Sequence, residues 1–270
     1  MVDMSYLVAD RDYYAPLADV DPGPRFHADP MPAGWLRHDS GVWTHWARAG
    51  SVLIDTGWKV HVSSSLANAQ SVLTVVAGAC ARAGIQFKHL TGRRTFLLLH
   101  GKHGTRVQAG KFCALYPPTE ESAAAIMRKL QAELSGIGGP YVLTDRRFDT
   151  SECVSYRFGA FRRRSRIDGD GYQVSTMLMP DGRELDDERK PRFQLPDGVI
   201  DPFREHSPAV QWKSPVVLGG YRFERVLQHS NAGGAYRFTD EQDTPVFLKE
   251  ARSYNGYTDE GARREGPAER

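Results

Sequence analysis

The segment Trp58–Ser63 constrains the fold of this chain more than any other. An apolar residue alternates with a polar one throughout the segment. A period of two residues is the pattern of a strand with one buried face. The polar face of this strand presents Lys59 and His61 side by side. We therefore expect a sheet with a cation next to an imidazole on its more polar face.

The remaining pattern up to residue 161 combines short strands with two helices. Apolar residues at helical spacing predict helices over 66–82 and 119–135. Ser63–Ser65 and Thr119 are the expected N-caps, and Gly84 is the expected C-cap. Strands are expected at 35–46, 51–55, 85–89, 112–116 and 153–161, with a further apolar run at 94–99. This order predicts an α+β fold, a mostly antiparallel sheet with flanking helices.

The chain is expected to contain two units. Residues 1–215 form the larger unit, with a looped arm at 1–34. Apolar periodicity is weak over 162–215, which indicates a mobile polar loop and a linker. Residues 216–270 form the smaller unit. Its strands are expected at 221–227, 234–238 and 246–249.

Composition limits the functions open to the chain. A formal net charge of +2 is too small to indicate nucleic-acid binding, so any cationic function must be local. Three cysteines without a CxxC pair indicate reduced thiols in a cytoplasmic protein, not a disulfide framework or a zinc site. We find no signal peptide and no apolar run long enough to span a membrane. We therefore expect no membrane, nucleic-acid or metal partner.

Six basic residues of the larger unit are candidates for one cluster. They are Lys59, His61, Lys88, Arg106, Arg147 and Arg157. Cations gathered without matching acids repel one another, so an anion such as phosphate is needed to hold them together. Crowding lowers the pKa of a lysine, whereas a phosphate raises the pKa of a neighbouring histidine. A neutral lysine base, a histidine acid and a phosphate cradle can perform β-elimination. Each side chain taken alone is more often an exposed charge or a structural histidine.

Short runs in the larger unit resemble a known family. Lys59–His61, Phe87–Lys88, and Arg106 followed ten residues later by Tyr116 resemble the site pattern of the phosphothreonine lyases secreted by bacterial pathogens. Three runs resemble, more closely, the N-terminal lyase domain of class III and class IV lanthipeptide synthetases: Trp58–His61, Gly110–Phe112 through Tyr116–Pro117, and Tyr156–Gly159. The resemblance implies a carbon–oxygen lyase that needs no cofactor. Its substrate would be phosphoserine or phosphothreonine in a precursor peptide, and its product dehydroalanine or dehydrobutyrine.

The resemblance also implies a role for each residue of the site. Lys88 would be the general base and His61 the general acid. Gln86 stands where the pathogen lyases carry another lysine, so that phosphate contact would either be missing or be supplied by Lys111 or Arg94. The implied phosphate-binding residues are Lys59, Arg106, Tyr116, Arg147, Arg157 and Lys111.

The smaller unit resembles the start of a protein kinase N-lobe. Ser230–Tyr236, with Gly233 and Gly234, resembles the glycine-rich loop, and Lys249 resembles the third-strand lysine of a nucleotide site. Glu265 would be its ion-pair partner. In lanthipeptide synthetases a kinase and then a cyclase domain follow the lyase domain, and both are implied partners. The pattern stops before the aspartates that a kinase needs, so we expect an incomplete lobe without kinase activity.

Two other functions stay open from the sequence. A phosphopeptide or leader-peptide reader needs the cations but not the pair Lys88 and His61. An inactive fragment that docks on a partner kinase and cyclase would expose apolar surface on Val246–Leu248. Release of phosphate from a phosphopeptide distinguishes the lyase from both.

Overall fold

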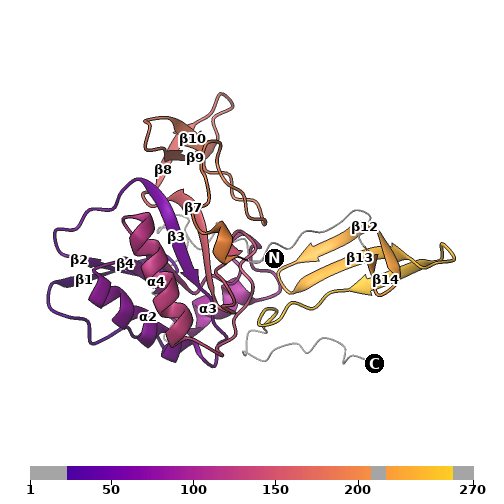
Figure 1. The fold of residues 1–270 in the computed structure, drawn as a ribbon, viewed down its shortest axis with the longest axis horizontal. Helices are drawn as coiled ribbons and strands as arrows, with labels where there is room; N and C mark the ends of the chain where they lie inside the picture. Colours follow the sequence, from indigo (N-terminus) through magenta and orange to yellow (C-terminus); the bar gives the residue numbers. More distant parts are fainter. Residues whose placement is uncertain (1–22, 208–216, 258–270) are drawn as a thin grey trace.

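A seven-stranded sheet forms the centre of the larger unit in the computed structural model, which describes residues 23–207 and 217–257 (Figure 1). Its strand order is β1-β2-β4-β5-β3-β7-β6, and every neighbouring pair is antiparallel. The strands are β1 (Trp35–Ser40), β2 (Trp43–Arg48), β3 (Thr56–Val62), β4 (Gln86–Leu90), β5 (Cys113–Tyr116), β6 (Arg146–Arg147) and β7 (Val154–Ala160). The predicted α+β class with a mostly antiparallel sheet is confirmed.

Two helices cover one face of this sheet. They are α2 (Ala69–Ala83) and α4 (Glu120–Glu133), which lie side by side (Figure 1). Gly84 ends α2 in the left-handed region, and the Thr119 side chain accepts a hydrogen bond from the backbone of Ser122. The prediction that Ser63–Ser65 caps α2 is wrong, because the helix begins later and Asn68 occupies the N-cap.

The alternation in β3 divides its side chains between the two faces as predicted. Trp58 is buried with 3% of its surface exposed, and Val60 and Val62 are fully buried in the core beneath the helices. Lys59 and His61 point to the other face, because successive side chains of a strand alternate. This face of the sheet carries the polar groups described below.

The apolar run at 94–99 belongs to a helix. It forms α3 (Arg93–His100), whose buried residues Phe96 and Leu99 are three positions apart. A short apolar run does not by itself distinguish a strand from a buried helix. The strand expected at 51–55 is also wrong, because those residues form a loop before β3.

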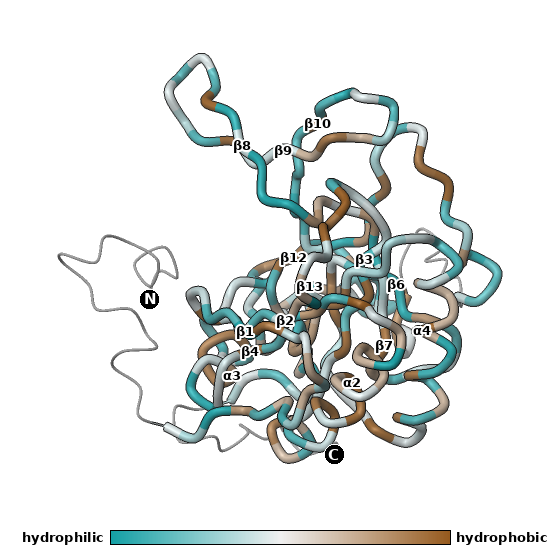
Figure 2. The backbone as a smooth tube through the Cα atoms, turned by 90° about the vertical axis from the view of Figure 1, so that its left-hand side faces the viewer, coloured by the Kyte–Doolittle hydropathy of each residue, from teal (hydrophilic) through white to brown (hydrophobic). Residues whose placement is uncertain are grey.

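The polar loop expected at 162–201 is ordered in part. It contains the three-stranded sheet of β8 (Arg164–Ile167), β9 (Gln173–Leu178) and β10 (Glu184–Asp186). The β8–β9 hairpin is largely hydrophilic and extends away from the body (Figure 2). Met177 and Met179, by contrast, are buried in the main core. This anchorage corrects the expectation of a mobile excursion.

The smaller unit is a four-stranded antiparallel sheet. Its strands are β11 (Val217–Leu218), β12 (Tyr221–Ser230), β13 (Gly233–Thr239) and β14 (Pro245–Lys249). The three predicted strands are confirmed. A short 3-10 helix (Arg204–His206) ends the described part of the larger unit. Most of the predicted arm (1–22), the end of the linker (208–215) and Glu265 lie outside the described residues.

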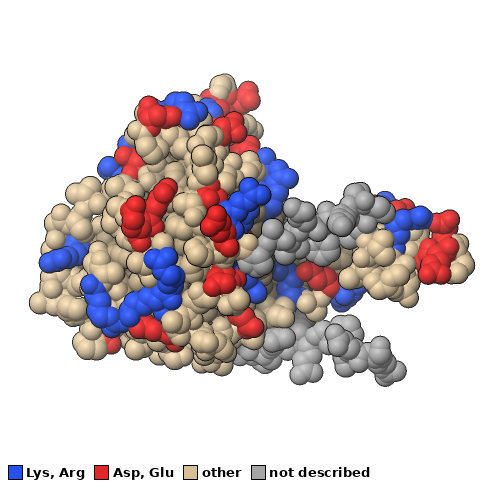
Figure 3. Space-filling view, viewed as in Figure 1, with Lys and Arg blue, Asp and Glu red and all other residues tan. Residues whose placement is uncertain are grey.

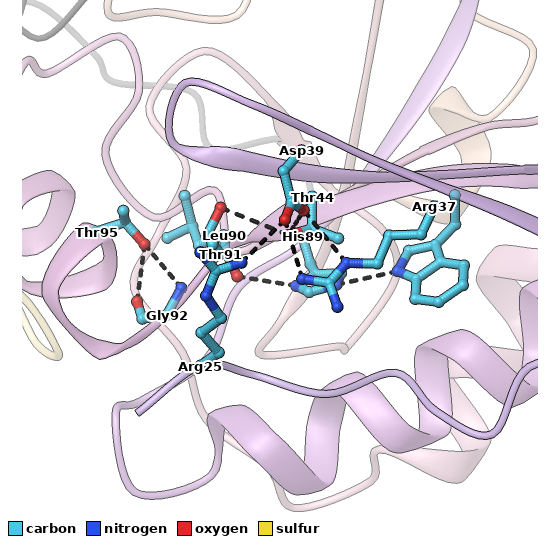
Figure 4. A network of polar contacts seen from close by, with 10 residues as sticks. Arg25, Arg37, Asp39, Thr44, His89, Leu90, Thr91, Gly92 and Thr95 are labelled. Atoms are coloured by element: carbon cyan, nitrogen blue, oxygen red, sulfur yellow. Dashed lines mark hydrogen bonds and ion pairs between the residues drawn. The ribbon is translucent and has the colours of Figure 1, made fainter. Parts of the chain in front are cut away.

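A polar network fixes the edge of the main sheet. Asp39, near the end of β1, accepts hydrogen bonds from Arg25 (2.9 Å), Arg37 (3.0 Å) and Thr44 (2.7 Å) (Figure 4). These charge-assisted bonds hold β1 against β2 in register. Because β2 begins at Trp43, they also fix the position of that indole.

Candidate active site

One cross-strand row crosses all seven strands and contains both predicted catalytic residues. From β1 to β6 it consists of His38, His45, Lys88, Ala114, His61, Ser155 and Arg147. Directly paired residues point to the same face of a sheet. Lys88 and His61 are therefore on one face, two strand spacings or about 10 Å apart at the backbone. Ala114 lies between them, and its small side chain leaves a hollow.

A pocket occupies this hollow. Six of the predicted site residues line it: Lys59, His61, Lys88, Lys111, Tyr116 and Arg157. Trp43, Gln108, Ala114 and Arg189 complete the lining. The space between these side chains is about 380 Å³ when the open solvent at its mouth is included.

His61 is held by a buried carboxylate. Its Nδ1 lies 2.5 Å from Oδ2 of Asp145. Ser155 donates a hydrogen bond to the same oxygen, and Thr144 donates to Oδ1. Burial lowers the pKa of His61 to about 4, although Asp145 opposes this shift; Lys111 and Lys59 add to the lowering. Burial raises the pKa of Asp145, but its interaction and hydrogen bond with His61, followed by the charges of Lys111 and Arg157, outweigh burial and bring that pKa below its ordinary value. Because Asp145 engages Nδ1, Nε2 is the ring nitrogen left to serve the pocket.

Lys88 approaches the pocket from the other side. Its Nζ lies 4.3 Å from the centre of the Trp43 ring. Burial and, to a smaller extent, the charge of Arg189 lower the pKa of Lys88 to about 8. About a tenth of the amine is therefore neutral at pH 7. This is the state that a general base requires.

Further cations meet between these two residues. Lys59 and Arg157 are directly paired across β3 and β7, an arrangement that is unfavourable without an anion. Burial and the charge of Arg157 place the pKa of Lys59 well below its ordinary value. Burial also lowers the pKa of Lys111 to about 7, against the effect of Asp145. Burial raises the pKa of the Tyr116 phenol, which keeps it protonated as a donor.

The segment after β10 adds a residue pair that the sequence did not single out. Asp187 is buried and bridges two guanidinium groups, that of Arg157 (3.4 Å) and that of Arg189 (2.7 Å). Arg189 thereby reaches the pocket. The charged run at 186–190 was the only signal in the sequence, and such a run is usually a solvated surface. Likewise, nothing local marked Asp145, Trp43 or Gln108.

The cations gather through sheet register and not through overall charge. Basic and acidic side chains are interspersed over the face drawn in Figure 3, in keeping with the net charge of +2. Among the described residues, no group of three histidine, cysteine or acidic side chains could hold a metal ion. No helix of the described part is both long and apolar enough to cross a membrane.

A comparison with known families matches residues 24–214 to the family described as "RamC, N-terminal domain". The chain belongs to the RamC N-terminal domain family. It is also 37% identical over 238 residues to the "Probable SapB synthase" of Streptomyces coelicolor. This match covers 87% of this chain and 25% of that protein. The chain thus spans about a quarter of the length of this relative. The resemblance to the N-terminal domain of a lanthipeptide synthetase is confirmed.

Solved structures of phosphothreonine lyases are similar in part to this RamC N-terminal domain. The VirA (SpvC) effector of Chromobacterium violaceum is 19% identical, with a TM-score of 0.37, and the match covers 50% of this chain and 69% of that one. OspF of Shigella flexneri is 22% identical, with a TM-score of 0.36 and coverages of 48% and 72%. SpvC of Salmonella is 20% identical, with a TM-score of 0.38 and coverages of 52% and 70%.

Two of the predicted phosphate-binding residues do not line the pocket of this RamC N-terminal domain. Arg147 occupies the end of the cross-strand row, where its guanidinium lies 5.3 Å from the centre of the Tyr141 ring. Arg106 lies toward the smaller unit. Burial lowers the pKa of His229 there, and the charge of Arg106 lowers it as well. Arg94, the alternative to Lys111, is exposed on α3. Gln86 shares the face of Lys88, and its amide donates to Ser51 (2.9 Å).

The residues of the expected nucleotide loop are packed into the protein. Gly233 and Gly234 begin β13, and a Cβ on Gly233 would lie 2.0 Å from the carbonyl oxygen of Glu250. Lys249 ends β14, directly paired with Ala235. The expected apolar exposure of β14 is present at Phe247, which is 62% exposed. Whether these residues bind nucleotide stays a prediction.

Proposed function

We propose that residues 1–215 eliminate phosphate from phosphoserine or phosphothreonine in a lanthipeptide precursor peptide. The observation that carries the proposal is that Lys88 and His61 line one pocket together with four other cationic side chains. A base and an acid on either side of an anion site are the groups that β-elimination requires.

Phosphate binding is the first step of this function. Lys59, Lys111, Arg157 and Arg189 surround the space beside Ala114. A phosphate monoester dianion offers oxygens to all of them, bidentately to arginine. Its charge offsets the effects of burial and of mutual repulsion, which otherwise lower the pKa of each lysine. The predicted roles of Arg106 and Arg147 are left out of this step because both lie outside the pocket.

The elimination follows from the positions of Lys88 and His61. The neutral amine of Lys88 removes the α-proton, and the electron pair of the C–H bond forms the new carbon–carbon double bond. The bond between the β-carbon and the bridging oxygen breaks. Nε2 of His61 supplies a proton to that oxygen, and inorganic phosphate leaves. The bound dianion raises the pKa of His61 above its value in the empty pocket, and Asp145 stabilises the imidazolium.

A phosphopeptide reader without turnover is the second candidate. The pKa of His61, about 4, favours this candidate, because the ring is then uncharged before an anion binds. Incubation with a phosphoserine peptide decides between the two by mass spectrometry. The lyase proposal expects loss of phosphoric acid from the peptide; stable binding of an intact peptide would support the reader.

The remaining expectations concern the surroundings of this activity. We propose that the boundary between the units lies near residue 215 and that residues 216–270 correspond to the beginning of a kinase N-lobe. The kinase and cyclase domains of the same synthetase would then be the partners, in the cytoplasm. This arrangement is supported if a protein that contains all of these domains both phosphorylates a precursor peptide and eliminates phosphate from it.

A further inference from the structure

The segment 101–111 connects α3 to β5 and brings two residues into the pocket. These are Gln108 and Lys111. The segment has no helix or strand of its own and is held by turn hydrogen bonds, including one from Lys111 Nζ to the carbonyl of Val107 (2.7 Å). Its path therefore depends on contacts made at its two ends.

The smaller unit holds the beginning of this segment. Asn231, at the turn between β12 and β13, is 1% exposed. Its Nδ2 donates to the carbonyls of Leu99 (2.9 Å) and Gly101 (3.0 Å), and its backbone N–H donates to that of Lys102 (3.2 Å). A Cβ on Gly104 would lie 3.1 Å from the same Nδ2 and 2.5 Å from the carbonyl of Leu99. The amide is thus enclosed by the segment that it binds.

Arg252 connects the same turn to the end of the segment. Its guanidinium donates to the carbonyl of Tyr141 (2.6 Å) and to that of Asn231 (3.3 Å). The carbonyl of Tyr141 lies 3.4 Å from the position of a Cβ on Gly110. Gly110 directly precedes Lys111, so the end of the segment lies beside a carbonyl that the smaller unit binds.

We propose that Asn231 is a positioning residue for the phosphate pocket. Through the carbonyls of Leu99 and Gly101 it sets the path of segment 101–111, which places Gln108 and Lys111 over the sheet. Its effect on turnover rests on the proposed function, whereas its effect on the segment does not. The loop that resembles a nucleotide-binding element thus serves the pocket of the other unit.

The variant Asn231→Asp tests this proposal. It keeps the size of the side chain but replaces the donor with a carboxylate that faces two carbonyl oxygens. We expect amide hydrogen exchange in 101–111 to rise at least ~10-fold, with exchange in β3 and β7 unchanged. Binding of a phosphoserine peptide should weaken ~10-fold through a higher KM and a nearly unchanged kcat. The matched control is Arg222→Gln, which breaks an exposed ion pair with Asp243 on the smaller unit.

Exchange in 101–111 equal to that of the control would overturn the proposal. If Asn231→Asp does not fold, Arg252→Ala decides, because the bond of Arg252 to Tyr141 is exposed: faster exchange at 108–111 supports the proposal and unchanged exchange overturns it. The exchange measurement needs no turnover. If the wild-type protein never releases phosphate, the proposed lyase activity is contradicted. Amide hydrogen exchange in 101–111 would still decide the role of Asn231.

Discussion

Lys88 and His61 lie in one cross-strand row of the main sheet, with Ala114 as the only residue between them. The row fixes which face both side chains share, and the methyl group of Ala114 fixes how much space remains. A base and an acid are thereby held on opposite sides of a hollow in which cationic side chains meet.

Ala114→Leu should fill this hollow. The larger side chain would occupy the space assigned to phosphate, so we expect phosphopeptide affinity to fall at least ~10-fold, or by about 1.4 kcal/mol. Isothermal titration calorimetry measures the change. Ala114→Ser is the control, since it adds little volume and should bind nearly as wild type. Unchanged affinity in the leucine variant would place the phosphate elsewhere.

Asp145→Asn should impair the acid and not the phosphate cradle. An amide at this position no longer stabilises the imidazolium of His61, so we expect kcat to fall ~100-fold or more. Thr144→Val, which removes only a hydrogen bond to Asp145, serves as the control. The idea is contradicted if kcat is the same in the asparagine variant and in this control.

Turnover should increase with pH through the titration of Lys88. The folded-state pKa is about 8; the amine is protonated and inactive below it and neutral above it. We therefore expect kcat at saturating peptide, where the bound dianion keeps His61 protonated, to rise toward pH 8. A profile that is flat between pH 6 and 9 would exclude Lys88 as the titrating base.

The same shift predicts a pH-dependent stability difference. The pKa of Lys88 falls from 10.5 in the unfolded chain to about 8 in the folded protein. Between these values the unfolded state binds more protons than the folded state, so the free energy of unfolding increases as the pH rises. Lys88→Met lacks this penalty. Its stability advantage over wild type should be full below pH 8 and vanish near pH 10.5, as chemical denaturation at each pH can show; an advantage that does not depend on pH would argue against the shift.

Arg189→Gln should weaken the response of the protein to phosphate. An anion that binds the folded state raises the melting temperature, and Arg189 reaches the pocket through its pairing with Asp187. Arg183→Gln, at an exposed ion pair in the β9–β10 turn, is the matched control. We expect phosphate to stabilise the control as it does wild type and the Arg189 variant much less. Equal stabilisation of both would remove Arg189 from the site.

Local pattern predicted one half of this site and long-range packing determined the other. Lys59 and His61 follow from the alternation in β3, because a period of two assigns both to one face. Asp145 comes from a loop 84 residues beyond His61, and no local pattern connects the two. Arg189 belongs to a charged run, which is usually a solvated surface. The sequence pattern did not indicate that Met177 and Met179 are buried in the core and bring this part of the chain back to the main sheet. Arg106 was misplaced because its distance in sequence from Tyr116 does not indicate the direction of the segment between them.

The central claim is that Lys88 acts as a base on a substrate held by the other cations. The most direct test compares wild type with Lys88→Ala on one phosphoserine peptide, following both binding and the mass of the peptide. The account predicts that wild type releases phosphoric acid, and that the variant binds the peptide but leaves it intact. Equal turnover by the two proteins, or an intact peptide with both, would contradict it.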